Sequence, residues 1–179
     1  SRGTLSSFSL ILMLISFLQR RTPPILPSLQ DIAFSQSWPP DYVNGIDCRY
    51  CTDSAAIEAE LAYLRGREAP NDESVGTLLV EFFRYYGYEY RHGIIRIRDT
   101  RSFVPPGDEK GYYLVVDNPF EIGKDVANID ASQQDLIKKE FRRGFALLKE
   151  GRPFRDLLAD PSAPGESAAA RRAAPAHRS

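Results

Sequence analysis

The spacing of hydrophobic positions along the chain predicts more helix than strand. Apolar residues recur at steps of three and four, the spacing of one helix face, in several stretches. These stretches are Ser54–Arg65, Ser74–Tyr86 and Gln133–Leu148, with a last turn at Phe154–Leu158. Asn71 or Asp72 can cap the second stretch, and Gly87 can end it. In the third, the predicted buried face consists of Leu136, Ile137, Phe141, Phe145 and Leu148.

The first thirty residues begin with a denser apolar run. Thr4–Gln19 is predicted to be a helix capped by Thr4 or Ser6 and buried on most sides, because its apolar residues lie all round it. The run Phe8–Leu18 is too short for a membrane span, which needs about 20 residues, so we interpret it as a core helix. Pro23 and Pro24 stop the helix, and an extended or short helical connector follows.

Strands are predicted at only a few places. Gly93–Arg98 and Tyr112–Val116 are expected to form an antiparallel pair. Residues 31–52 indicate a long surface excursion with a short strand near Asp47–Cys51, and the chain from Pro161 onward lacks the apolar residues needed to fold. The predicted fold class is therefore α+β and mainly helical, with one small antiparallel strand pair.

Composition limits the possible functions. The net charge of −1 provides no overall attraction to nucleic acid, so any RNA contact requires a local basic patch. Two basic clusters could supply it, although such clusters are more often solvated faces. The RNA-binding candidates are Arg84, Arg96 and Arg98 around the predicted strands, and Lys138, Lys139 and Arg142 on the last long helix.

The cysteines and the common catalytic motifs do not indicate a reaction centre. Cys48 and Cys51 form a lone CxxC, for which only His92 and His177 remain as further zinc ligands, so we interpret them as ordinary thiols. The sequence contains no phosphate-binding glycine loop, no HExxH and no Asp-x-Asp pair for two metal ions. We therefore predict no catalytic residue and no metal ligand in this chain.

Three separated stretches nevertheless carry related motifs in order. They are Gly3–Phe8 continuing to Pro23–Gln30, then Glu73–Tyr86, then Asp117–Ala127. Together they resemble the family of terminal uridylyltransferases and non-canonical poly(A) polymerases. That family has a Ser-Ser-Tyr helix with a Leu-Met run, a Pro-Pro segment, and an Asp-Pro-Phe-Glu loop in its PAP-associated domain.

The resemblance implies a fold and an activity. The family joins a nucleotidyltransferase domain of the DNA polymerase β superfamily to a helical domain and binds a nucleoside triphosphate between them. Its catalytic aspartates and phosphate-binding lysines precede the motif matched at Ser7. We therefore expect this chain to be a C-terminal fragment, inactive alone, of an enzyme that adds UMP from UTP to RNA 3′ ends. Mg²⁺ or Mn²⁺ would be held by the upstream aspartates and not by this chain.

The resemblance also implies nucleotide-binding residues. Phe8 matches a tyrosine that stacks on the base, and Ser7 matches a serine that contacts the triphosphate. Glu121 matches an acid that helps to recognise the base edge. Asn118 replaces the family's aspartate, and Lys124 stands where uridine-selective members often have histidine, so the choice between UTP and ATP stays open. Without the family, Phe8 would be a core aromatic and Asn118 part of an Asn-Pro turn.

These implications complete the sequence-based hypothesis. Residues 1–30 would belong to the central helical domain, 31–70 to an insertion, 71–160 to the PAP-associated domain and 161–179 to a tail. Expected partners are an RNA 3′ end, UTP or ATP, and the N-terminal catalytic domain, with neither DNA nor membrane. The alternatives are a non-canonical poly(A) polymerase and a non-catalytic paralogue that binds RNA or protein. We expect a cytoplasmic location, with nucleus and mitochondrion as alternatives.

Overall fold

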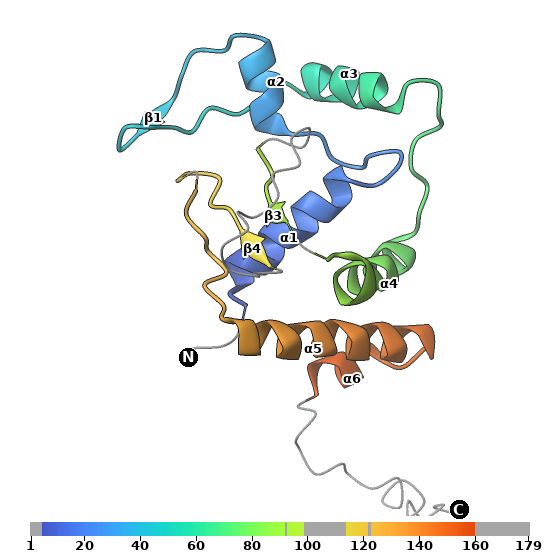
Figure 1. Cartoon of the computed structure of the whole chain (residues 1–179). Coiled ribbons are helices and arrows are strands. Elements are labelled where there is room, and N and C mark those ends of the chain that lie inside the picture. Colours follow the sequence, from blue (N-terminus) through green and yellow to red (C-terminus); the bar gives the residue numbers. More distant parts are fainter. Residues whose placement is uncertain (1–4, 92, 99–113, 122, 160–179) are drawn as a thin grey trace, which may run out of the picture.

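The computed structural model describes residues 5–91, 93–98, 114–121 and 123–159. Helices dominate these residues and two short strand pairs accompany them, so the predicted α+β class is confirmed (Figure 1). The elements are α1 Ser7–Gln19, α2 Leu29–Ser35, β1 Tyr42–Val43, β2 Ile46–Asp47, α3 Ser54–Arg65, α4 Val75–Arg84, the π-helical turn η1 Tyr85–Glu89, β3 Ile94–Ile95, β4 Val115–Val116, α5 Ala131–Lys149 and α6 Phe154–Leu158. Thr4, His92, His177 and the predicted tail lie outside the described residues.

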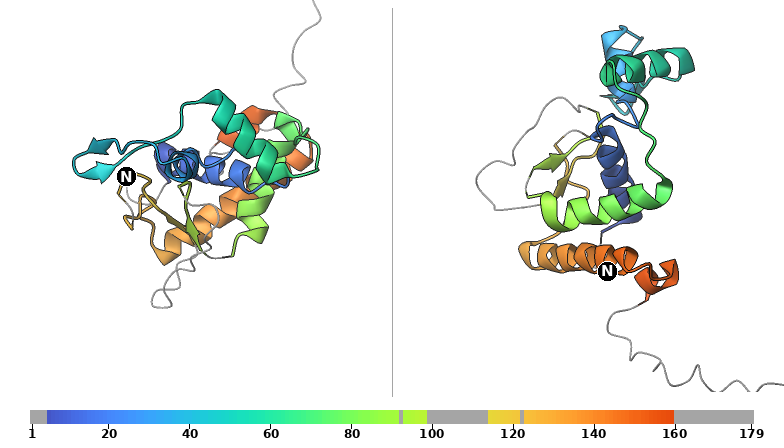
Figure 2. Two further views of the ribbon diagram at one scale, coloured as in Figure 1. Left: turned by 90° about the horizontal axis from the view of Figure 1, so that it is seen from above. Right: turned by 90° about the vertical axis from the view of Figure 1, so that its right-hand side faces the viewer.

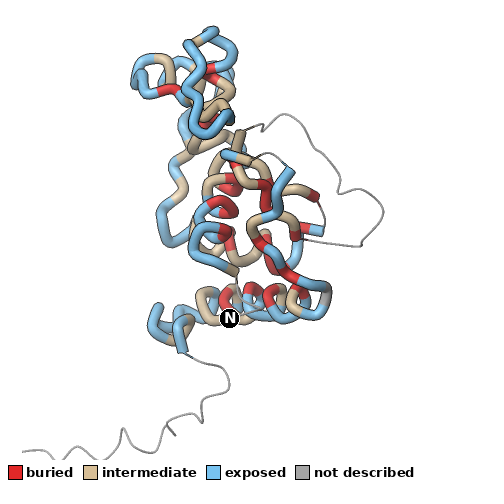
Figure 3. The backbone as a smooth tube through the Cα atoms, turned by 90° about the vertical axis from the view of Figure 1, so that its left-hand side faces the viewer, coloured by how far each residue is buried: buried red, intermediate tan, exposed pale blue. Residues whose placement is uncertain are grey.

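Helix α1 passes through the middle of the main core (Figure 1). It begins at Ser7 because the hydroxyl of Ser6 accepts the backbone N–H of Ser9 at 3.0 Å, which confirms Ser6 as the cap. Met13 is fully buried, but Ile11 is 55% exposed. The prediction of burial on most sides is therefore wrong, because only one face of α1 packs on the core and the other faces outward (Figure 3).

Aromatic side chains fill the space between α1 and the helices across from it. The rings of Phe17 and Phe82 meet edge to face at 5.7 Å, and the hydroxyl of Tyr86 donates to the carbonyl of Met13 at 2.9 Å. Phe82 also contacts Phe141 of α5, so α1, α4 and α5 share one core. Figure 2 shows α5 as a separate layer along the far side of α4.

Both ends of α4 differ from the prediction. Ser74 caps the helix by accepting the N–H of Thr77, in place of the expected Asn71 or Asp72. Gly87 does not end it, because the chain continues through the π-helical turn η1 and buries Gly87 against α5. A Cβ at this position would lie 3.2 Å from the backbone nitrogen of Arg142, so the close approach favours glycine.

Helix α5 begins at a capping box. Asp130 accepts the N–H of Gln133, and the side chain of Gln133 accepts the N–H of Asp130 in return. Ile137 and Phe141 are buried as predicted, whereas Leu136 is 59% exposed. The predicted face was wrong at Leu136, because this residue adjoins Ile137 and so points about a quarter turn away from the core.

The strands β3 and β4 run parallel, not antiparallel as predicted. Ile94 pairs with Val115 and Ile95 with Val116. Residues 96–114 separate the two strands, which is long enough for the crossover that parallel pairing needs. The antiparallel return occurs after β4 instead, where Asp117 bridges Asp125.

Residues 28–65 form a second, smaller unit. Ser28 caps α2, a helix that the sequence prediction placed within a surface excursion. The second strand of the hairpin, β2, is Ile46–Asp47, slightly before the predicted Asp47–Cys51. The turn between β1 and β2 is Asn44-Gly45, and both of its residues have positive φ. Helix α3 has the predicted bounds.

The core of this unit is small and includes one of the two cysteines. Cys51 is buried with Ile32 and Ala33, and Cys48 is half-buried, both as free thiols. None of the helices within the described ranges is both long enough and apolar enough to cross a bilayer.

Candidate functional site

The N-terminal end of α1 presents the two residues expected to hold a nucleotide. Ser7 is the first helical residue and is exposed, and the ring of Phe8 is 41% exposed. The first N–H groups of a helix have no partner within it, so this end favours an anionic ligand. A phosphate at Ser7 and a base at Phe8 are therefore chemically compatible with the position of both residues.

The same helix end is bonded to a loop that lies far along the sequence. Ser9 is fully buried, and its hydroxyl donates to the backbone carbonyl of Val126 at 2.9 Å. We call residues 117–121 and 123–125 the recognition loop. Because Val126 directly follows this loop, the bond places the N-terminus of α1 beside the segment that carries the other expected nucleotide contacts.

Two aspartates, the buried Asp117 and the exposed Asp125, fix the recognition loop. Asp117 is 8% exposed and accepts the N–H of Gly123 at 2.7 Å and the Nε–H of Arg96 at 3.0 Å. Asp125 accepts the N–H groups of Val116 and Ala127 at 3.0 and 2.9 Å. The hydrogen bonds of these two carboxylates therefore hold the loop in place.

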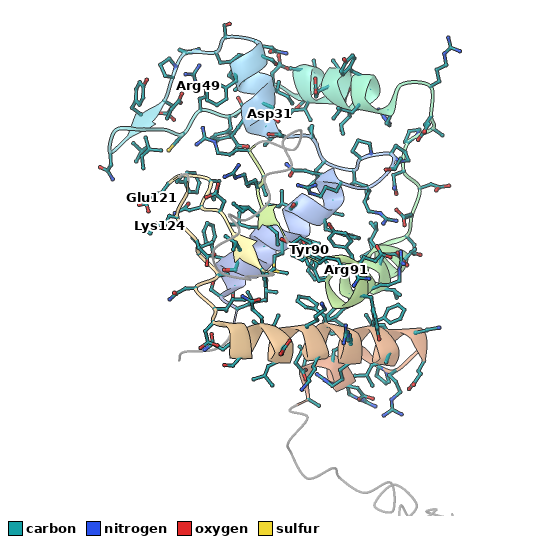
Figure 4. The ribbon with its side chains drawn as sticks, viewed as in Figure 1. Asp31, Arg49, Tyr90, Arg91, Glu121 and Lys124 are labelled. Carbon is teal, nitrogen blue, oxygen red and sulfur yellow. The ribbon has the colours of Figure 1, made fainter. Side chains whose placement is uncertain are left out.

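The three predicted base-recognition residues lie together on this loop. The side-chain oxygen Oδ1 of Asn118 accepts the N–H of Phe120 at 3.0 Å, which closes a turn typical of Asn before Pro. The carboxylate of Glu121 forms an ion pair with the ammonium of Lys124 (Figure 4). Both side chains are well exposed, at 44% and 63%. Such exposed pairs contribute about 0–1 kcal/mol, so a ligand can displace this one.

Two of the basic residues predicted to bind RNA adjoin the recognition loop. Arg96 forms its ion pair with Asp117, and Arg98 donates from Nη1 to the carbonyl of Pro119 at 2.8 Å. Both guanidinium groups therefore contact the loop itself. Contact of Arg96 and Arg98 with RNA stays a prediction.

The other four basic candidates lie on α4 and α5. Arg84 forms ion pairs with Glu81 and Glu89, and the hydrogen bond with Glu81 raises the pKa of its guanidinium. Arg142 donates to the carbonyl of Gly87 at 2.8 Å. On the same helix Lys138 is half-buried and Lys139 is exposed. The structure thus divides the six basic candidates between the recognition loop and the α4–α5 layer.

The described residues contain no group of three or more metal-binding side chains. The two aspartates of the recognition loop are hydrogen-bonded to backbone N–H groups and to Arg96, so they do not form a ligand set for a divalent ion. The metal expected from the family would need ligands from elsewhere in the enzyme, which stays a prediction.

Sequence reasoning missed Ser9 as part of the site. Ser9 could have been recognised as a polar residue inside an otherwise apolar helix, because a hydroxyl is costly to bury without a partner. It also missed the structural role of Asp125, although an aspartate next to a turn commonly accepts backbone N–H groups.

The N-terminal part of an apolar helix is thus hydrogen-bonded to the residue that directly follows an Asn-Pro-Phe-Glu loop. Residues 74–123 match the family model of the PAP-associated domain, described as Cid1 family poly A polymerase. The chain belongs to the family of non-canonical poly(A) polymerases and terminal uridylyltransferases.

Individual relatives cover most of the chain. It is 36% identical to the poly(A) RNA polymerase cid13 of Schizosaccharomyces pombe, over 82% of this chain and 25% of the relative. It is 29% identical to the human terminal uridylyltransferase 4, over 88% of this chain and 10% of the relative. The structure of a Cid1 poly(U) polymerase mutant bound to MgATP superposes with a TM-score of 0.68 and 28% identity, over 88% of this chain and 48% of that one.

These shares have a consequence for function. The chain spans about a quarter of the length of the first curated relative and about a third of the next. Names of both adenylyl- and uridylyl-transferring enzymes occur among the relatives. The names of the relatives thus agree on the family and differ in the nucleotide that each enzyme transfers.

Proposed function

We propose that this chain is the base-recognition part of an RNA 3′-terminal nucleotidyltransferase that adds UMP from UTP to RNA. In this proposal the ring of Phe8 stacks on the base, since stacking requires only a flat π face. The hydroxyl of Ser7 binds the triphosphate at the N-terminus of α1. Acidic residues elsewhere in the enzyme hold the metal ions that supply the phosphoryl-transfer chemistry.

The observation that carries the preference for UTP is the orientation of the Asn118 side chain. Its Oδ1 accepts the N–H of Phe120, so the group that remains for a ligand is its amino donor. Lys124 adds a second donor and Glu121 an acceptor. Uracil presents two carbonyl acceptors around one N–H donor, which matches this set. Adenine presents one amino donor beside one ring acceptor and would leave a protein donor unpaired.

The runner-up is a poly(A) polymerase that uses ATP. It is supported by the 36% identity to cid13, which exceeds the identity to the uridylyltransferase. The third hypothesis is a non-catalytic paralogue that binds RNA or protein, and it predicts no nucleotide affinity.

The test is RNA extension by the full-length protein that contains this chain. A 5′-labelled RNA with a free 3′-hydroxyl is incubated with Mg²⁺ and either UTP or ATP, and the products are separated on a gel. We expect extension with both nucleotides and a clear preference for UTP. A preference for ATP would support the runner-up, and no extension together with no UTP or ATP binding would support the non-catalytic paralogue.

A further inference from the structure

The guanidinium of Arg98 joins three parts of the molecule. Nη1 donates to the carbonyl of Pro119 in the recognition loop at 2.8 Å, and Nη2 donates to the carbonyl of Asp47 in β2 at 3.1 Å. The same group lies over the ring of Phe34 in α2, 5.7 Å from its centroid. One side chain therefore ties the recognition loop to the unit formed by α2 and the hairpin.

The backbone around Arg98 is itself held in place. Its carbonyl accepts the hydroxyl of Ser28 at 2.9 Å, and the carbonyl of Ile97 accepts the side-chain amide of Gln19 at 3.0 Å. Gln19 ends α1, and Ser28 caps α2. The side chain of Arg98 thus extends from an anchored point, and its fork can set the position of the carbonyls that it binds.

Arg49 provides a natural comparison. It lies over the same Phe34 ring at 4.5 Å, and its Nε donates to the carboxylate of Asp47 at 2.7 Å. Its Nη1 donates to the carbonyl of Trp38 at 2.6 Å. All these contacts stay within residues 34–49, so Arg49 stabilises the hairpin unit without touching the recognition loop.

We propose that Arg98 is a positioning residue for base selection, a role that rests on the proposed function. It holds Pro119, which directly follows Asn118, and so fixes how the tip of the recognition loop faces the base. The stem of the loop is held independently, at its start by the Arg96–Asp117 ion pair and at its end by the hydrogen bonds that Asp125 accepts from Val116 and Ala127. Loss of Arg98 therefore leaves the loop attached at its stem and loosens only the tip that carries Asn118 and Glu121.

The kinetic test uses Arg98→Met, Arg98→Lys and the matched control Arg49→Met in the full-length protein. We expect Arg98→Met to raise KM for UTP and lower the UTP/ATP preference, each by about 2- to 30-fold, the range for residues that act through another group. The kcat at saturating UTP should change less than KM. Arg98→Lys should behave similarly, because an ammonium lacks the fork that spans both carbonyls. Arg49→Met should leave both values as in the wild type.

A second measurement does not depend on nucleotide chemistry. Hydrogen exchange of the Asn118 and Lys124 amides should accelerate in Arg98→Met and stay unchanged in Arg49→Met. Unchanged exchange in Arg98→Met would overturn the positioning role, even if the wild type neither bound nor transferred a nucleotide. A rise in KM for RNA alone, with UTP/ATP preference intact, would also overturn it and would indicate direct RNA contact. Accelerated exchange in a protein without nucleotide affinity would sustain the positioning of the loop and refute the proposed function.

Discussion

The hydroxyl of Ser9 donates to the carbonyl of Val126, which lies 117 residues further along the chain. This bond joins the helix end that carries Ser7 and Phe8 to the residue that directly follows the loop carrying Asn118 and Glu121. In the proposed function, the phosphate, stacking and base-edge contacts act on one nucleotide.

Replacing Ser9 by alanine should weaken both the fold and the site. The change takes the Ser9 hydroxyl from the half-buried Val126 carbonyl and removes its bond with the Ser6 hydroxyl, at a cost of about 1–3 kcal/mol. Urea unfolding measures this loss, and UTP titration should show reduced affinity in the same variant. Ser16→Ala is the control, because Ser16 is buried on the same helix but accepts only a long 3.4 Å bond from Arg20. Equal effects of both variants would contradict a specific role of the Ser9 bond.

Phe8→Ala should weaken nucleotide binding by about 1–3 kcal/mol, the range for the loss of one base stack. Phe8→Tyr should bind as the wild type does, since the aromatic face is kept. Equilibrium titration of UTP into the full-length protein measures both. Phe8 is 41% exposed, so its truncation should have a smaller effect on stability than on binding. Wild-type affinity in Phe8→Ala would refute the stacking role.

Asn118→Asp should lower the preference for UTP over ATP. An aspartate can still accept the Phe120 N–H through one oxygen, but it replaces the amino donor by a second acceptor beside Glu121. The ratio of kcat/KM for UTP and ATP measures the change in the full-length protein. A higher UTP/ATP ratio would show that the carboxylate typical of the family recognises uracil better, and our donor-based account would then be wrong.

Gly144→Ala should destabilise the contact between α4 and α5. A Cβ there would lie 2.4 Å from the ring of Phe83, so the packed helices would have to move apart, at a cost of about 1–3 kcal/mol. Gly76→Ala is the control within α4, where a Cβ meets only Ser74 Oγ at 3.7 Å. It should stabilise the helix by about 0.5–1 kcal/mol. Thermal unfolding of both variants distinguishes close packing from a general intolerance of alanine.

The hairpin ion pair should persist in acid. The hydrogen bond from Arg49 lowers the pKa of Asp47 from 3.8 to about 2. Because the pKa is lower in the folded state, the stabilising contribution is fully present above pH 3.8 and is lost as the pH falls through about 2. Carbon NMR titration of the Asp47 carboxyl should show this low value, and Arg49→Met should return it toward 3.8. Titration of the wild-type group near 3.8 would contradict the pairing.

Local signals in the sequence were sufficient for most of the helices. Ser54–Arg65 was predicted with its observed bounds, because apolar periodicity acts over a few neighbouring residues. The Asn-Pro turn at Asn118 was also expected from the sequence, since such a turn depends on local hydrogen bonds. The family followed from three motifs in a fixed order.

Tertiary structure alone decided the properties that depend on residues far apart. The parallel pairing of β3 with β4 depends on where a long connection returns, and periodicity within each strand contains no information about direction. The exposed side of α1 likewise could not be predicted, because an apolar helix surface does not indicate which neighbouring elements cover it. Arg98 could be recognised as basic from the sequence, but its hold on Pro119 and Asp47 arises only when three distant segments meet.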